Sequence, residues 1–131
     1  MNKKFLTILT MVLLAVSLIG CKPSKEEMIA NAIKMDWQEI HDDQNSARSE
    51  AKYGKGLVKW TGKVDIIDNK YAIMYGDEYL GHLISPIVYV YLSQEDLSKL
   101  NKNDTVTVVG KFEMPSNTYI NINEAILVDS K

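Results

Sequence analysis

The sequence predicts a mostly β protein: a five-stranded β-barrel with a short helix between strands 3 and 4, preceded by an N-terminal helical segment. Three observations support this fold class. From residue 56 onward, apolar residues recur at every second position, the spacing of half-buried strands. Residues 93–103 return to helical spacing inside that half. Before residue 56 the apolar residues recur at helical spacing, so we expect the mature chain to begin with helices.

The first twenty residues indicate a secretion signal that is not part of this fold. Lys3 and Lys4 form a positively charged start, and residues 5–19 are an apolar run of 15 residues. A membrane span needs about 20 residues, so the run is too short for a permanent span and fits a signal peptide.

The junction Leu18-Ile19-Gly20-Cys21 resembles the lipobox of bacterial lipoproteins. The resemblance implies that Cys21 receives diacylglycerol on its sulfur, with acyl chains such as palmitate, and that cleavage occurs after Gly20. Two acyl chains are enough for stable attachment, so we expect a lipid anchor on the extracytoplasmic side of the cell membrane. Which membrane carries the anchor stays open. The alternative, an uncleaved buried helix with a chance cysteine, fits the charged start and the junction less well.

After cleavage, 111 residues remain, enough for one modest domain. We divide the precursor into a signal peptide (1–20), a lipidated cysteine with a short tether and a helical lead-in (21–55), and a β domain (56–131). Without Lys3 and Lys4 the chain has 13 basic and 17 acidic residues, a formal charge of −4. Such a domain has no long-range attraction for phosphate backbones, which disfavours nucleic acid as a partner.

The lead-in is expected to be helical. Ser24-x-x-Glu27 matches a capping box, and the apolar residues after it predict one amphipathic helix over residues 25–41. The polar run 42–46 is expected to break this helix, and a second helical piece should extend from Ala47 to Tyr53.

Five strands are expected after the lead-in. Their ranges are 58–66, 70–75, 87–92, 105–112 and 118–128. Asp68-Asn69 predicts a turn, and residues 114–117 predict a loop. Residues 76–86 predict either a long loop or a continuation of the preceding strand with a break. Gly62 and Gly110 fall on the apolar side of their strands, where a missing side chain permits a bend or bulge.

The short helix has its own signals. Ser93 is a suitable N-cap with Asp96 three residues later, and Asn103 suits the left-handed residue that ends this segment. Five strands with one helix between the third and fourth are the arrangement of the OB fold.

Two stretches of the chain carry a further pattern. In the first, Tyr53-Gly54-Lys55 precedes Trp60-Thr61-Gly62-Lys63-Val64; in the second, a leucine pair precedes Asn103-Asp104-x-Val106-x-Val108-x-Gly110. Together they resemble the tRNA anticodon-like OB family of small bacterial proteins, many of them lipoproteins. The match covers about residues 45–128, with Asn103 at a usual glycine. It implies the fold and no activity, because a shared fold does not transfer function.

Tyrosines mark the candidate binding surface, because the strand 2–3 face is where OB domains usually bind. Five tyrosines lie on or between the expected second and third strands: Tyr71, Tyr75, Tyr79, Tyr89 and Tyr91. Such rings stack on bases or sugars, and neighbouring lysines bind phosphate. The ligand-binding candidates are Tyr75, Tyr89, Tyr91, Lys59 and Lys63. The alternative is that tyrosines favour strands in general and merely cover the barrel.

Catalytic and metal-binding patterns are weak. His82 with Asp77 and Glu78 fits no dedicated metal-binding loop, and a solvated loop is the better interpretation. His41-Asp42-Asp43 is better explained by capping and solvation at a helix end than by general-base chemistry. We therefore expect no catalytic residues, no metal and no cofactor.

The sequence thus predicts a non-catalytic, membrane-anchored OB lipoprotein of the cell envelope that binds an envelope protein or a small ligand. The alternative is binding of single-stranded nucleic acid or oligosaccharide by the OB face. An enzyme would need a pocket with convergent titratable groups, and no motif in the sequence predicts one.

Overall fold

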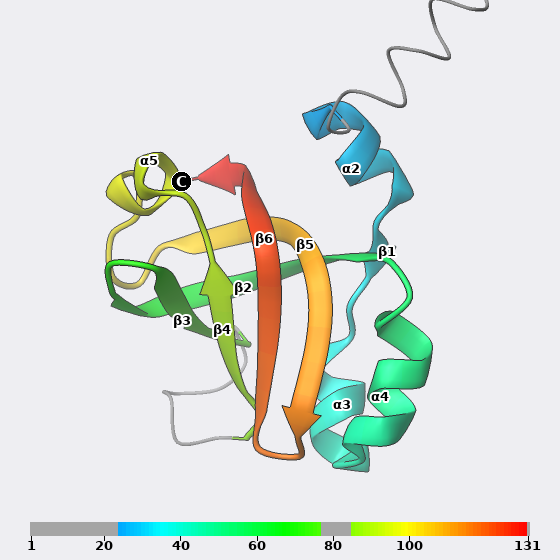
Figure 1. Ribbon diagram of the computed structural model, residues 1–131. Helices are drawn as coiled ribbons and strands as arrows, with labels where there is room; N and C mark the ends of the chain where they lie inside the picture. Colours follow the sequence, from blue (N-terminus) through cyan, green and yellow to red (C-terminus); the bar gives the residue numbers. More distant parts are fainter. Residues whose placement is uncertain (1–23, 77–84, 131) are drawn as a thin grey trace, which may run out of the picture.

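The computed structural model describes residues 24–76 and 85–130, and its main feature is a closed five-stranded β-barrel (Figure 1). The strands are β1 (Ile33–Lys34), β2 (Leu57–Ile67), β3 (Tyr71–Tyr75), β4 (Ile87–Tyr91), β5 (Thr105–Ser116) and β6 (Tyr119–Ser130). Their order in the sheet is β1-β2-β3-β4-β6-β5, and β2 also pairs with β5, which closes the ring. β4 and β6 run parallel, whereas the other neighbouring barrel strands are antiparallel. This strand order is that of an OB barrel, so the predicted fold class is confirmed.

The five barrel strands and the helix between β4 and β5 lie where the spacing of apolar residues predicts them. The helices are α2 (Lys25–Asn31), α3 (Trp37–Asp43), α4 (Ser46–Tyr53) and α5 (Gln94–Ser98). Ser93 caps α5 as expected, and Asn103 is left-handed with a φ of 76°. In the described ranges, no helix has the length and apolar character that crossing a membrane requires.

The single helix expected over residues 25–41 is wrong. α2 ends at Asn31, and β1 then pairs in parallel with Val58–Lys59 of β2. The backbone N–H of Met35 donates to the carbonyl of Lys59 at 2.8 Å. β3 pairs with β2 only from Lys63 onward, and β1 pairs with the earlier part of β2 that β3 does not cover. Bonding to the barrel overrides the helical spacing of this segment.

The loop expected at residues 114–117 is also largely wrong. β5 continues to Ser116, which pairs with Tyr119 of β6 across a tight turn. Met114 points inward and is buried, and its backbone N–H donates to the Glu50 carboxylate of α4 at 2.5 Å. A register shift after Glu113 accommodates the proline of this segment, as bulges do.

The two glycines on the apolar side have different roles. At Gly110 the β5–β6 register shifts, and an added Cβ would lie 2.6 Å from the Ile122 side chain, so the expected bulge is present. At Gly62 an added Cβ would lie 2.6 Å from the Trp60 ring, while the β2 irregularity comes two residues later. Gly62 therefore makes room for a buried indole ring.

The core is shared by the barrel and the lead-in. The inward residues of all five barrel strands form one cluster with four lead-in residues, Met35, Trp37, Ile40 and Tyr53. In the part of the chain that the structure describes, every buried hydrophobic residue lies between Met35 and Leu127. A chain that begins at Lys22 therefore retains this whole core.

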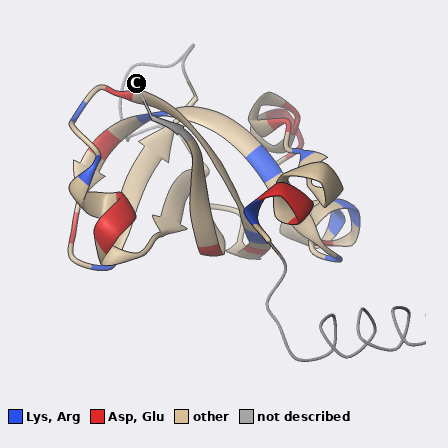
Figure 2. Ribbon diagram, turned by 90° about the horizontal axis from the view of Figure 1, so that it is seen from above, with Lys and Arg blue, Asp and Glu red and all other residues tan. Residues whose placement is uncertain are grey.

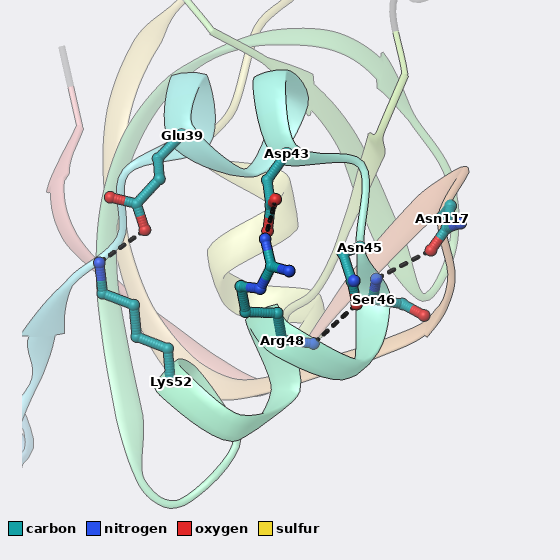
Figure 3. A network of polar contacts seen from close by, with 7 residues as sticks. All are labelled: Glu39, Asp43, Asn45, Ser46, Arg48, Lys52 and Asn117. Carbon is teal, nitrogen blue, oxygen red and sulfur yellow. Dashed lines mark hydrogen bonds and ion pairs between the residues drawn. The ribbon is translucent and has the colours of Figure 1, made fainter.

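Polar contacts join α3 to α4 and attach this pair to the turn between β5 and β6 (Figure 3). Arg48 pairs with Asp43, and the backbone N–H of Arg48 also donates to the Asn45 side chain at 3.0 Å, which caps α4. Asn117, in the turn between β5 and β6, accepts a hydrogen bond from the Ser46 backbone at 2.8 Å. The Ser46–Asn117 hydrogen bond therefore joins the lead-in to the barrel, whereas the contacts of Arg48 lie within the lead-in.

Candidate functional site

The outer surface of β3, β4 and β6 carries one connected group of tyrosines. We call Tyr71, Tyr89, Tyr91 and Tyr119 the tyrosine face. The ring centroids of Tyr71 lie 5.3 Å from Tyr89 and 5.6 Å from Tyr91, and Tyr89 lies 6.0 Å from Tyr119. All four side chains are half-buried. Such ring contacts stabilise a sheet surface and also fix the rings as one unit.

The strand register explains why these rings meet. Buried residues alternate with half-buried ones along β3 and β4, so the tyrosines point outward. Tyr71 pairs with Tyr91, and Ile73 pairs with Tyr89. The parallel β4–β6 pair then places Ile87 beside Tyr119. The group therefore depends on barrel closure as well as on neighbouring strands.

The rings of the tyrosine face do not form a flat shelf. The interplanar angles are 74° for Tyr71–Tyr89, 57° for Tyr71–Tyr91 and 90° for Tyr89–Tyr119. Bases stack on exposed ring faces, so consecutive bases need rings that present those faces outward. Rings packed edge to face present a rough, partly polar surface, which suits the side chains of a protein partner.

An exposed isoleucine extends the apolar surface along one side of the tyrosine face. Ile66 is 44% exposed and pairs with Ile73, the register partner of Tyr89. Ile67, the next residue of β2, is 39% exposed but pairs with the buried Ala72, so it does not belong to this face. Large exposed apolar side chains next to aromatic ones are typical of interaction surfaces.

Some charged side chains near the tyrosine face have polar partners, whereas Lys70, next to Tyr71, is exposed. The Asn121 amide donates to Glu113 at 2.9 Å, and Lys111 pairs with Glu124. At the other end, a hydrogen bond from the Tyr71 hydroxyl to the Asp68 carboxylate, followed by desolvation, raises the Tyr71 pKa above its ordinary value of 10.0.

The structure places the predicted ligand-binding residues in three locations. Tyr89 and Tyr91 belong to the tyrosine face, and Tyr75 lies at the end of β3 opposite Lys63 of β2. Lys59, expected beside the tyrosines, instead lines a pocket on the lead-in side of the barrel. Tyr79 and Cys21 lie outside the described residues.

Sequence reasoning missed Tyr119 as a member of this group. Its position follows from the parallel pairing of β4 with β6, which joins segments about thirty residues apart. Alternation along β6 does place Tyr119 on an outward position, but only the closed register shows which strand lies next to it.

The weaker chemical candidates have structural explanations where they are described. The His41 ring stacks on Trp37 with centroids 5.0 Å apart, and its Nδ1 contacts the carbonyl of Ser85. Trp37 Nε1 donates to the carbonyl of Pro86 at 3.0 Å. His41 therefore packs α3 against the start of β4, in place of the expected solvation at a helix end.

The other metal-site candidate, His82 with Asp77 and Glu78, lies outside the described residues. Within residues 24–76 and 85–130, no group of three His, Cys, Asp or Glu side chains could hold a metal ion.

The fold is similar to that of a solved structure described as a "putative nucleic acid-binding lipoprotein" from Klebsiella pneumoniae subsp. pneumoniae MGH 78578. The two chains are 15% identical with a TM-score of 0.64, and the match covers 82% of this chain and all of that chain. At this identity the likeness shows the fold alone. Neither protein-family models nor curated proteins give a match, so the resemblance to the tRNA anticodon-like family stays a prediction.

Proposed function

We propose that this protein is a lipid-anchored, non-catalytic OB module of the cell envelope, of the tRNA anticodon-like type, that binds an envelope protein through the tyrosine face. The observation that carries the proposal is the connected group of four half-buried tyrosines on the outer side of β3, β4 and β6. This is the side on which OB domains usually bind their ligands.

Three features of this surface favour a protein partner. Tyrosine is enriched among the residues that contribute most to protein–protein binding. Ile66 and Ile73 extend the surface with apolar area. Its rings also form a rigid unit, which lowers the entropy lost on association. A small apolar ligand would need an enclosed pocket, and the pocket of about 910 Å³ that Trp60 lines is on the lead-in side of the barrel.

The envelope location is supported by the signal-like residues 1–20, by the Gly20-Cys21 junction and by the fold similarity to a lipoprotein. A Cys21→Ser variant is expected to remain an uncleaved precursor without lipid, because the thiol is the acceptor. Incorporation of labelled palmitate measures this directly. Continued labelling of the variant would overturn the anchor.

The binding proposal is tested with the double variant Tyr89→Ala, Tyr91→Ala. Crosslinking in cells followed by affinity recovery should yield an envelope protein with the parent chain and lose it with the double variant. Ile33→Ala is a matched control, because Ile33 is 48% exposed and belongs to the lead-in. Equal recovery with both variants would reject the tyrosine face as the binding surface.

Binding of single-stranded nucleic acid or oligosaccharide is the second candidate. Its support is the aromatic surface on the usual OB side and the description of the Klebsiella protein. Nucleic-acid binding of this kind weakens steeply as salt rises. Titration of an oligonucleotide, and separately of envelope glycan fragments, at low salt tests it. Binding that Tyr89→Ala removes would favour this candidate over the protein partner.

A further inference from the structure

A pocket of about 910 Å³ lies on the opposite side of the barrel, between the lead-in and β2. Ile29 and Ala32 line it from the lead-in, and Trp60 and Thr61 line it from β2. Three lysines, Lys34, Lys52 and Lys59, also line this pocket, so it combines apolar walls with positive charge.

Two of these lysines are held side by side by the backbone. Lys34 of β1 and Lys59 of β2 are register partners in the parallel pair, so both side chains lie on the same face of the sheet. Like charges placed directly opposite each other on neighbouring strands are destabilising. An anion between the two ammonium groups would convert this repulsion into attraction.

Two carboxylates, Asp36 and Glu39, also line the pocket. Lys52 bonds to Glu39 at 2.6 Å (Figure 3), and the Asp36 carboxylate accepts the backbone N–H of Glu39 as the cap of α3. Among the described residues, no carboxylate forms an ion pair with Lys34 or Lys59. Three lysines against two carboxylates leave the pocket with a formal charge of +1, and the two lysines without an ion pair to a described residue are Lys34 and Lys59.

The proposed anchor places the pocket close to lipid. Two residues, Lys22 and Pro23, separate Cys21 from Ser24, and the three steps between them span at most about 11 Å. The seven residues of α2 add about 10 Å. Only the tether and α2 therefore separate the lipidated cysteine from the residues that line the pocket. Figure 2 shows acidic and basic residues mixed on the lead-in helices, so this side is not a generally basic surface.

From this geometry we infer that the Lys34–Lys59 pair binds the phosphate of an anionic phospholipid headgroup. The inference rests on the proposed anchor, which brings the pocket to the membrane. Binding of a headgroup at this pair would orient the barrel on the membrane. The lead-in side of β2 and β5 would face the lipid, and the tyrosine face on β3, β4 and β6 would point away from it, toward a partner.

The test uses the chain from Lys22 onward, which lacks the acyl group but keeps the whole described core. Its sedimentation is measured with vesicles of phosphatidylcholine alone and with vesicles that also contain phosphatidylglycerol. The variants are Lys34→Gln with Lys59→Gln, and a control of equal charge, Lys70→Gln with Lys102→Gln, at exposed sites outside the pocket. Thermal unfolding of each variant, recorded in parallel, monitors folding.

The expected result is binding to the phosphatidylglycerol vesicles alone. This binding should weaken about fivefold for each pocket lysine removed, given the attraction of one lysine near an anionic surface. The control variant should bind like the parent chain, and the pocket variant should unfold no earlier than the parent because a repulsion is removed.

Three results would overturn the inference: no binding to anionic vesicles, equal weakening in both double variants, or binding of free glycerol phosphate without binding to vesicles. The last result would assign the site to a free phosphate compound. Because the chain tested carries no lipid, these outcomes are independent of the palmitate assay on Cys21, so failure of the headgroup site and failure of the anchor are distinguishable.

Discussion

The two sides of the barrel differ in what their aromatic residues do. On the lead-in side, Trp37 and Tyr53 are 4% and 1% exposed, and both hydrogen-bond to backbone groups. On the opposite side, Tyr89 and Tyr91 are half-buried and contact other tyrosines. The same residue class therefore stabilises the fold on one side and forms a candidate binding surface on the other. Burial and backbone partners separate these roles.

The largest expected effect lies on the lead-in side. Trp37→Ala removes a buried ring and its hydrogen bond to Pro86, so it should lower the free energy of unfolding by about 4 kcal/mol. Denaturant unfolding followed by circular dichroism measures the loss. Ile33→Ala, at a half-exposed lead-in position, should change stability by less than about 0.5 kcal/mol. A small loss for Trp37→Ala would mean that the lead-in is only loosely attached to the barrel.

The next largest loss of stability is expected for Gly110→Ala, in the β5–β6 pair of the barrel. An alanine Cβ at Gly110 would lie 2.6 Å from Ile122 Cγ2 and 2.8 Å from the carbonyl oxygen of Asn123. Because backbone must move, Gly110→Ala should cost about 3 kcal/mol, measured in the same way. Gly56→Ala is the matched control, since an added Cβ there meets nothing within 4 Å. Equal stability of the two variants would show that the β5–β6 bulge adapts freely.

The two sides also differ in how far the sequence predicts them. Alternation from Val58 onward located all five barrel strands, because each strand has one buried and one exposed side. The lead-in was harder: Ile33 and Lys34 have helical spacing, but hydrogen bonds to a distant strand decide their conformation. One local signal was available, because Asp36-x-x-Glu39 matches a capped helix start and the Asp36 side chain does cap α3.

The candidate site shows the same limit. Outward positions of Tyr71, Tyr89 and Tyr91 follow from alternation, whereas the inclusion of Tyr119 and the separation of Lys59 from the tyrosines depend on which strands are neighbours. Neighbour relations in a closed barrel are long-range properties, and a local pattern does not contain them.

A smaller stability effect is expected on the tyrosine face. Tyr89→Ala and Tyr91→Ala each remove one half-buried ring and its aromatic contacts, so each should cost about 1 kcal/mol, well below the loss for Trp37→Ala. Denaturant unfolding of the two single variants measures this difference. A loss as large as that of Trp37→Ala would make these tyrosines structural and would weaken the case for a binding surface.

The smallest effect concerns proton binding at the edge of the tyrosine face. The hydrogen bond to Asp68 raises the pKa of Tyr71 above 10.0 in the folded chain. The folded state therefore holds this proton more tightly, so the associated stabilisation is complete below pH 10.0 and is lost as pH rises through the folded pKa. Asp68→Asn removes the carboxylate and should return the pKa toward 10.0, as followed by NMR of ring-labelled tyrosine. Asp42→Asn on α3 is the control, and an equal shift there would show that overall charge, not the local hydrogen bond, sets the pKa of Tyr71.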